Sequence, residues 1–281
     1  MYSSRKLAQL GRAIGTTKTV ADAERLEAQA NITAQAMRNL LVDSETGLFH
    51  DGLDGGAENH SAWHSQTSTL WLGVAQSATK PRMLEFLARK RMVGSVYAAY
   101  SYLLGLYEVD EDHGKVALEM MTDCDENSWC HMLTVNATST MEAWSRAEKP
   151  NLSWSHPWAT AAVTAIVRGF IGLTAVKPAF SSWQLKPQPG NATWAAIRVP
   201  SVAGLFDVSF NQTASSFGVA ITPPANTIGS VCLPKLGSSS PTLQVGTHTV
   251  PGTIQGDYVC ASGLAPAKGQ SVLHVTRTSA M

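Results

Sequence analysis

The sequence has no net charge and no long apolar run. Its 281 residues hold 21 basic and 21 acidic side chains, and neither sign forms a long run. A balanced chain has no field that would attract nucleic acid or an anionic membrane, so we expect neither as a partner. No apolar segment reaches the roughly 20 residues that span a bilayer. A small or neutral ligand is therefore the expected partner class.

Motifs of the commoner enzyme classes are also missing. The chain contains no P-loop, no dinucleotide-binding glycine run and no nucleophile elbow. His60 and His64 lie four residues apart, but no acidic residue completes a zinc motif, and "DCDENSWC" lacks the glycine and the distal glutamate of an EF-hand loop. We therefore expect no metal ion and no cofactor.

The chain has only four cysteines, and none forms the paired C-x-x-C of a zinc site. They are Cys124, Cys130, Cys232 and Cys260. Of the three possible disulfide pairings, the local one (124 with 130, 232 with 260) keeps each bridge inside one structural region. Buried reduced thiols are the alternative.

N-x-S/T sequences, among them those at Asn31, Asn136, Asn151, Asn191 and Asn211, favour a secreted glycoprotein. The motif is nevertheless common enough to arise by chance in a chain rich in Ser, Thr and Asn. The first 15 residues read as a helix of the mature protein and not as a signal peptide. For a secreted protein this predicts that the true N-terminus lies upstream.

The first 175 residues predict a succession of helices separated by Gly- or Pro-marked breaks. The expected helices are 20–42, 61–75, 81–91, 95–107, 112–122 and 157–170. In the first of them the apolar or small positions follow a 3.6-residue period: Leu26, Ala30, Thr33, Met37, Leu40 and Leu41.

After about residue 175 the pattern changes to alternation with a period of two. "GLFDVSF" and "SFGVAITPP" each alternate apolar and polar positions, as half-buried strands do. Short strands divided by Gly, Pro, Asn and Ser predict an antiparallel sandwich. We therefore predict a multidomain α + β protein with a helical domain at 1–178 and a β-sandwich at 179–281.

The segment "NATSTMEAWSRAEKPNLSWSHPW", residues 136–158, sets Glu142 and His156 among three tryptophans. Hydrolysis of a glycosidic bond needs two carboxyl groups, and Glu142 is a candidate for one. Tryptophan offers a flat wall for the C–H face of a sugar. From residue types alone, the preferred interpretation is that Glu142 is a helix N-terminal residue and that the tryptophans are core.

The order of two short motifs carries a family resemblance. "TSTMEAW" followed by "NLSWSHPW" resembles the "TT-x-W-E-x-W" and "S-L-S-H-x-W" segments of the α-L-rhamnosidases of glycoside hydrolase family 78. "GLFDVSF" and "VCLP" resemble strands of that family's C-terminal sandwich. The likeness covers nearly the whole chain. It implies a partial (α/α)6 toroid of helical hairpins, the second half of a six-hairpin glycosidase barrel, followed by an antiparallel β-sandwich.

The resemblance also implies roles for individual residues. Glu142 becomes the general base of an inverting hydrolysis of terminal α-L-rhamnose, and His156 a contact to the sugar. Four further side chains become walls of the pocket: Trp144, Trp129, Trp158 and His64. Met141 stands where the family often has tryptophan, and methionine fills apolar gaps tolerably.

One expected part is missing from the sequence. The family's general acid lies in an acidic segment upstream of everything present here. We therefore expect a secreted fragment that is inactive alone, with a rhamnosylated glycoside or glycan as its ligand and a missing N-terminal half of the barrel as its partner. The alternative is a non-catalytic carbohydrate-binding protein or a structural remnant of the family.

Overall fold

The computed structural model describes residues 2–53, 60–108, 113–238, 240–266 and 271–279. The chain forms two compact units, one of residues 1–109 and 120–161 and the other of residues 110–119 and 162–281. The predicted domain boundary at 178/179 was based on the change from helical to strand-like periodicity in the sequence. The compact units instead divide near Ala161, so the last helical turns belong to the same unit as the sheets.

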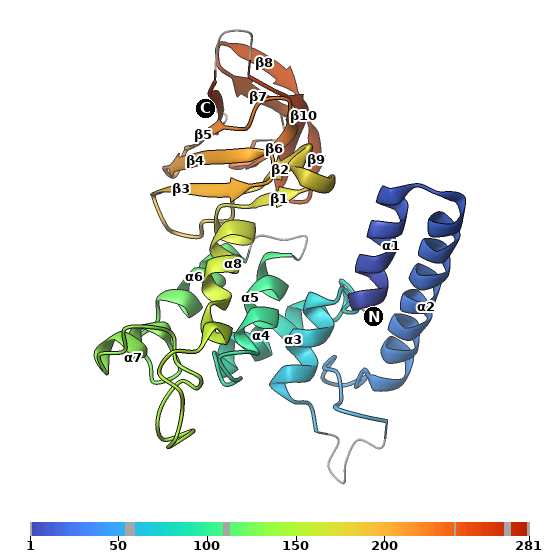
Figure 1. Cartoon of the computed structure of the whole chain (residues 1–281), viewed down its shortest axis with the longest axis vertical. Helices are drawn as coiled ribbons and strands as arrows, with labels where there is room; N and C mark the ends of the chain where they lie inside the picture. Colours follow the sequence, from blue (N-terminus) through green and yellow to red (C-terminus); the bar gives the residue numbers. More distant parts are fainter. Residues whose placement is uncertain (1, 54–59, 109–112, 239, 267–270, 280–281) are drawn as a thin grey trace. The chain divides into compact units, whose positions relative to one another are not determined.

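Helices occupy the first part of the chain, as predicted (Figure 1). They are α1 (Tyr2–Ile14), α2 (Thr17–Leu41), α3 (Trp63–Trp71), α4 (Lys80–Lys90), α5 (Ala99–Tyr107), α6 (Gly114–Thr122), α7 (Trp129–Thr134) and α8 (Ala161–Ala165). Residue 112, the predicted start of α6, lies outside the described residues. In the described part of the chain the helices do not close a barrel, in agreement with a partial toroid.

The segment predicted as one helix at 157–170 consists of three short pieces. A 3₁₀ turn, η2 (Pro157–Ala159), precedes α8, and the π-helical η3 (Ile166–Phe170) follows it. Pro157 lies in the first turn, where its missing N–H costs nothing. The turn holds Trp158 away from the regular helix that follows.

The hairpin of α1 and α2 is packed through small side chains. Gly11 lies against the backbone of Thr19, and Ala8 and Ala23 are buried beside it. The buried positions of α2 are Ala23, Ala30 and Ala34. The predicted apolar face of α2 was therefore partly wrong: Leu40 is 61 % exposed. The reason is that close helix approach selects the smallest side chains for the contact.

Two sheets make up the β-sandwich. Its strands are β1 (Leu173–Ala175), β2 (Ser182–Leu185), β3 (Trp194–Ser201), β4 (Gly204–Gln212), β5 (Ser216–Thr222), β6 (Ile228–Pro234), β7 (Thr242–Val245), β8 (His248–Pro251), β9 (Thr253–Gln255), β10 (Tyr258–Leu264) and β11 (Leu273–Thr278). The sheet orders are β1-β2-β6-β10-β9 and β3-β4-β5-β11-β7-β8. Paired strands run antiparallel except for β2 and β6, which are parallel.

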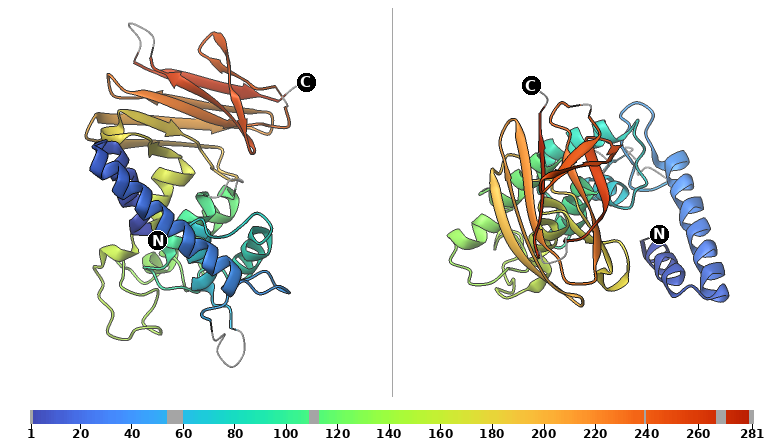
Figure 2. Two further views of the ribbon diagram at one scale, coloured as in Figure 1. Left: turned by 90° about the vertical axis from the view of Figure 1, so that its right-hand side faces the viewer. Right: turned by 90° about the horizontal axis from the view of Figure 1, so that it is seen from above.

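The core of the sandwich lies between the inner faces of the two sheets, which Figure 2 shows stacked as layers. Phe206, Val208 and Phe210 are buried, whereas Asp207 and Ser209 face the other way. The alternation read from "GLFDVSF" is therefore confirmed. In the opposite sheet Trp183 is fully buried, and its indole N–H donates to the Thr227 hydroxyl over 3.1 Å.

Both disulfides follow the predicted local pairing. Cys124 is bonded to Cys130, and Cys232 to Cys260. The second bridge joins β6 and β10 at directly opposite positions of the ladder. Each bond therefore braces one unit from within.

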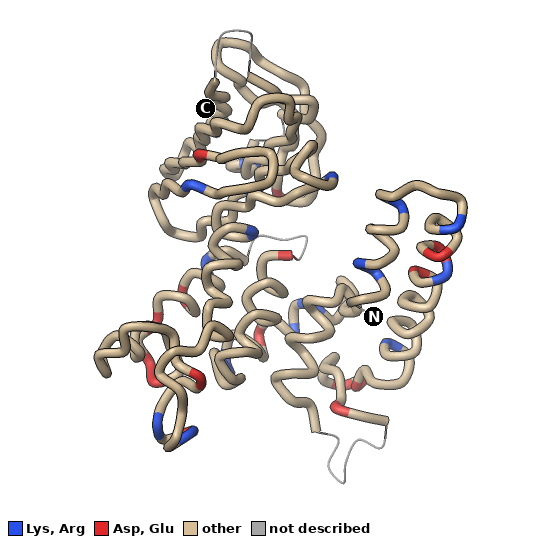
Figure 3. Tube along the Cα trace, viewed as in Figure 1, with Lys and Arg blue, Asp and Glu red and all other residues tan. Residues whose placement is uncertain are grey.

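No helix in the described ranges is long and apolar enough to cross a membrane. The charged residues of α1 are all basic, whereas α2 carries both signs and the strands carry few charged side chains (Figure 3).

Gly229 of β6 lies directly beneath Trp183, and a Cβ atom there would overlap the indole ring. We expect Gly229→Ala to lower the free energy of unfolding by about 1–3 kcal/mol, because the ring has no space to retreat in a filled core. Denaturant unfolding followed by tryptophan fluorescence measures the loss. Gly52→Ala is the control, because no atom lies within 4 Å of its added Cβ; equal stability of the two variants would contradict the packing argument.

Candidate functional site

Two loop segments, 140–142 and 153–156, pair with each other and form the base of the candidate site. The amide of His156 donates to the Thr140 carbonyl over 2.7 Å, and the Thr140 hydroxyl donates to the His156 carbonyl over 2.7 Å. The amide of Glu142 donates to the Ser153 carbonyl over 2.9 Å. The pairing brings the two sequence motifs that carry Glu142 and His156 side by side.

The carboxylate of Glu142 is held by two donors. The Ser153 amide donates to Oε2 over 2.9 Å, and the Lys149 ammonium donates to Oε1. The hydrogen bond from Lys149, followed by that from Ser153, lowers the pKa of the Glu142 carboxyl below its ordinary value, and the Coulombic interaction with His156 acts in the same direction. Glu142 is therefore ionised at neutral pH, as a general base must be.

The imidazole of His156 is half-buried, and its Nε2 atom is buried without a hydrogen-bond partner among the described residues. The ring packs edge-to-face on Trp158, with centroids 4.6 Å apart. Trp158 is 59 % exposed and also meets the ring of Tyr97 at 5.6 Å. An unpartnered buried nitrogen costs about 1–3 kcal/mol, a cost that a ligand hydroxyl can remove.

Tyr97 connects this aromatic pair to a pocket of about 570 Å³. The pocket is lined by residues of α3, of the segment that precedes α5 and of the start of α5: His64, Ser68, Trp71, Ser95, Tyr97, Ala98, Tyr100 and Ser101. Trp71 and Tyr100 meet edge-to-face at 5.5 Å. The lining combines aromatic faces with hydroxyl and imidazole groups, and none of these eight residues is Asp or Glu.

The other two predicted wall residues lie deeper. Trp144 is fully buried, and its indole N–H donates to the Gly94 carbonyl over 2.7 Å. Trp129 meets Trp144 edge-to-face at 5.0 Å and donates to the Ala159 carbonyl over 2.6 Å. Met141 is buried, as expected for a filler of apolar space. The two indoles thus support the loop pair from below, while His64 and Trp158 lie beside the open space.

Sequence reasoning missed several residues of the site. Tyr97, Trp71 and Tyr100 lie in sequence segments whose apolar pattern predicts only helices. The fold alone brings them to one pocket. Lys149 follows Glu142 by seven residues in a loop, where no periodicity predicts contact. His60 and His64, four residues apart in sequence, do not lie on one helix, because α3 begins at Trp63 and His60 instead bonds Asp51.

No group of three or more His, Cys, Asp or Glu side chains that could hold a metal ion occurs among the residues with described positions. The groups gathered at the site include the Glu142 carboxylate, the His156 and His64 imidazoles, the Lys149 ammonium and several aromatic rings. These groups suit the binding of a polyhydroxylated, partly apolar ligand such as a sugar.

Comparison with protein-family models gives two adjacent matches. Residues 1–168 match the bacterial alpha-L-rhamnosidase 6 hairpin glycosidase domain, and residues 172–247 match the bacterial alpha-L-rhamnosidase C-terminal domain. No curated protein matches the sequence.

Solved structures share the fold at low sequence identity. An alpha-L-rhamnosidase from Dictyoglumus thermophilum superposes with a TM-score of 0.75 at 16 % identity, covering 99 % of this chain and 31 % of that one. The Streptomyces avermitilis alpha-L-rhamnosidase complexed with L-rhamnose superposes with a TM-score of 0.73 at 17 % identity, covering 99 % of this chain and 26 % of that one. The native alpha-L-rhamnosidase from Aspergillus terreus superposes with a TM-score of 0.69 at 15 % identity, covering 93 % of this chain and 29 % of that one. The chain spans less than a third of the length of these relatives.

The ion pair between Lys149 and Glu142 can be tested by substitution. We expect Lys149→Met to raise the pKa of the Glu142 carboxyl towards its ordinary value, because the donor that lowers it most is removed. The stabilisation from this ion pair is present above the ordinary carboxyl pKa and is lost as pH falls through the lowered value. NMR titration of the Glu142 side-chain carbon, assigned with Glu142→Gln, measures the shift.

The matched control for this titration is Arg146→Met. It removes a cation of the same loop whose guanidinium lies over the Trp154 ring, 5.9 Å from the centroid. We expect it to leave the titration of Glu142 nearly unchanged. An unaltered Glu142 titration in Lys149→Met would show that Lys149 does not hold the carboxylate in solution.

Proposed function

The chain belongs to the bacterial alpha-L-rhamnosidase six-hairpin glycosidase family, and on that premise we propose that it carries the sugar pocket and the general base for inverting hydrolysis of terminal α-L-rhamnose. The observation that carries the proposal is the loop pair that sets an ionised Glu142 beside His156 and the Trp158–Tyr97 wall. The relative solved with L-rhamnose supports the choice of sugar.

The proposed reaction follows the inverting scheme for glycosides. Glu142 takes a proton from a water molecule as the water oxygen attacks the anomeric carbon, and the bond to the leaving oxygen breaks. Trp158 and Tyr97 bear on the apolar face of the sugar. Nε2 of His156, which has no hydrogen-bond partner among the described residues, bonds a sugar hydroxyl.

The leaving oxygen also requires a proton, which a second carboxyl group gives in this scheme. The sequence holds no acidic segment that matches the one carrying the family's general acid, and the chain spans 26–31 % of the first two relatives' lengths. We infer that the general acid comes from outside these 281 residues, along with helices that complete the barrel. Alone, the chain then binds the sugar but does not cleave ordinary glycosides.

A second function is favoured by one contact. The Lys149 ammonium occupies Oε1 of Glu142 and lowers its pKa, which weakens the carboxylate as a base. The same contact suits a fixed anion that accepts sugar hydroxyls. A non-catalytic carbohydrate-binding protein is therefore the competing proposal.

We also propose that the protein is secreted and glycosylated. Two disulfides are typical of chains that mature in an oxidising compartment. Among the described N-x-S/T sites, Asn31, Asn136, Asn151, Asn191 and Asn211 are exposed, so each is accessible to modification.

Activated substrates separate the two proposals, because their leaving groups depart without a proton. We expect the chain to release fluoride from the rhamnosyl fluoride whose α-linkage matches the proposed substrate, and to leave an alkyl α-L-rhamnoside intact. Glu142→Gln should lower fluoride release by about 10²–10⁴-fold, the range for general-base catalysis. Because the pKa of the Glu142 carboxyl is lowered, fluoride release by the unsubstituted chain should keep its rate as the pH falls through the ordinary pKa of glutamate. The rate should fall only at lower pH. Fluoride release unaffected by Glu142→Gln would contradict the assigned base.

Binding of L-rhamnose tests the pocket itself. We expect calorimetry of the full chain with L-rhamnose to give a binding isotherm that Trp158→Ala weakens about tenfold, because the aromatic wall is lost. Trp154→Ala is the matched control, since Trp154 is also exposed but faces Arg146. Absence of heat and of any thermal shift would favour a structural remnant over both proposed functions.

A further inference from the structure

The outer face of the six-stranded sheet is a second surface with groups suited to a ligand. Ile197, Val208 and their inward neighbours pack on the sandwich core, so the alternate residues of β3, β4 and β5 point outwards. The outward set contains Trp194, Ala196, Arg198, Asp207, Ser209, Asn211, Ala220 and Thr222. It belongs wholly to one compact unit and lies apart in sequence from the loop pair around Glu142.

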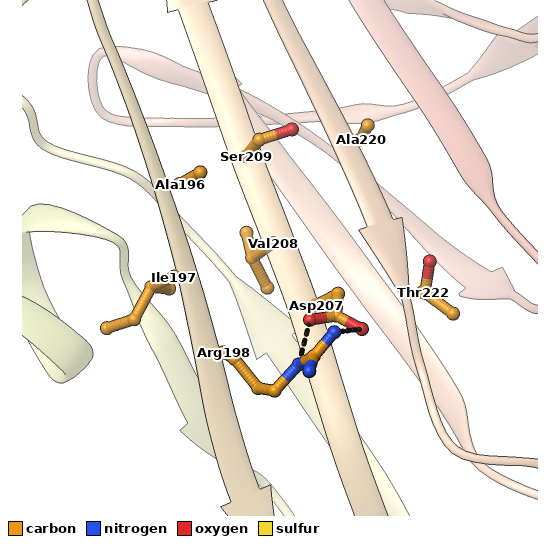
Figure 4. Close-up of a pocket in the computed structure, with 8 residues that line it drawn as sticks. All are labelled: Ala196, Ile197, Arg198, Asp207, Val208, Ser209, Ala220 and Thr222. Carbon is orange, nitrogen blue, oxygen red and sulfur yellow. Dashed lines mark hydrogen bonds and ion pairs between the residues drawn. The ribbon is translucent and has the colours of Figure 1, made fainter.

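A shallow depression of about 470 Å³ lies on this face (Figure 4). Its floor is made of small side chains, Ala196, Ser209 and Ala220, which stand opposite one another on adjacent strands. Small residues on three neighbouring strands keep the floor flat and open. A flat floor favours an extended ligand over a compact one.

A bidentate ion pair borders the depression. Nε of Arg198 donates to Oδ1 of Asp207 over 2.6 Å, and a terminal nitrogen donates to Oδ2 over 3.2 Å (Figure 4). The two residues are directly opposite in the β3–β4 ladder. The pairing fixes both planar groups and leaves further guanidinium N–H groups and carboxylate lone pairs for a ligand. Adjacent donors and acceptors match the neighbouring hydroxyls of a sugar.

Trp194 stands at the other end of the same face. Its side chain is 71 % exposed, and it lies opposite Asn211 in the β3–β4 ladder. Trp194 lies four positions before Arg198, which is about 13 Å along an extended strand. An exposed indole at that distance from a polar clamp suits a chain of sugar rings, in which one ring stacks and another is hydrogen-bonded.

The charge of the face selects the class of ligand. Asp207 neutralises Arg198, and the strands around them carry few charged side chains (Figure 3). The face therefore gives no net attraction for a phosphate, an acidic polysaccharide or an anionic membrane. A neutral ligand with many hydroxyls fits it best.

We propose that this face of the β-sandwich is a binding site for neutral oligosaccharide chains, with Trp194 stacking on one sugar and the Arg198–Asp207 pair bonding the hydroxyls of another. The site goes beyond the proposed hydrolysis and needs neither Glu142 nor the pocket at Tyr97. Its effect would be to hold the protein on a glycan.

Affinity electrophoresis of the full chain tests the proposal. The chain is made in bacteria, so that Asn211 carries no glycan next to Trp194. Native gels contain galactomannan, xyloglucan or arabinan as neutral probes, and polygalacturonate as the acidic one. We expect at least one neutral polymer to retard the chain and polygalacturonate to retard it less.

Variants identify the surface that binds. We expect Trp194→Ala and Arg198→Met each to raise the dissociation constant about tenfold, and Trp194→Phe to retain most of the binding because a ring remains. Arg25→Met is the matched control: Arg25 also pairs with an aspartate, and the Arg25 and Arg198 side chains are both 67 % exposed. Thermal unfolding checks that every variant is folded.

Glu142→Gln and Trp158→Ala separate this site from the proposed catalytic pocket. Retardation that persists in both, but is lost in Trp194→Ala, supports the sheet site even if rhamnose binding and fluoride release both fail. Three outcomes overturn the proposal: no retardation by any neutral probe, equal retardation by polygalacturonate, and retardation that Trp194→Ala leaves intact. The last outcome would assign the binding to another surface.

Discussion

The pairing of loop segments 140–142 and 153–156 is the constraint on which the candidate site depends. Neither segment is a regular helix or strand, so their backbone groups must find partners elsewhere. They find them in each other, through Thr140 with His156 and Glu142 with Ser153. Without this pairing, a carboxylate and an imidazole 14 positions apart in sequence would have no fixed relation. The pairing also places the Ser153 amide and Lys149 on the carboxylate, and so sets its ionisation.

Aromatic contacts hold this loop pair on the helices. Trp144 and Trp129 meet edge-to-face, and the indole N–H groups of both donate to backbone carbonyls. Trp158 and Tyr97 continue the aromatic contacts towards the pocket. The buried indole of Trp144 and the partly buried indole of Trp129, both with satisfied donors, make a firm support, whereas the indole of Trp158 is exposed. The tryptophans of one short segment thus divide between framework and surface.

The β-sandwich uses its two faces for different purposes. The inner face is fixed by packing, as the contact of Trp183 with Gly229 illustrates. The outer face of β3, β4 and β5 is free of that demand, yet it carries an exposed tryptophan and a bidentate ion pair beside a flat depression. Surface ion pairs contribute little to stability. The proposed role of this pair is therefore to bind a ligand at the edge of the depression and not to stabilise the fold.

The sequence by itself determined the succession of helices and the strand alternation of "GLFDVSF", because periodicity is written in consecutive residues. It offered the local disulfide pairing as one possibility, and the structure chose it over reduced thiols. It pointed to Glu142 only through the order of two motifs. Tertiary structure decided the rest: the buried alanine face of α2, the break after Pro157, and the partners of Glu142. It also decided which tryptophans are core, since Trp144 and Trp158 have the same chemistry and differ only in what packs over them. Loop pairing and burial depend on contacts between distant residues, which no local pattern encodes.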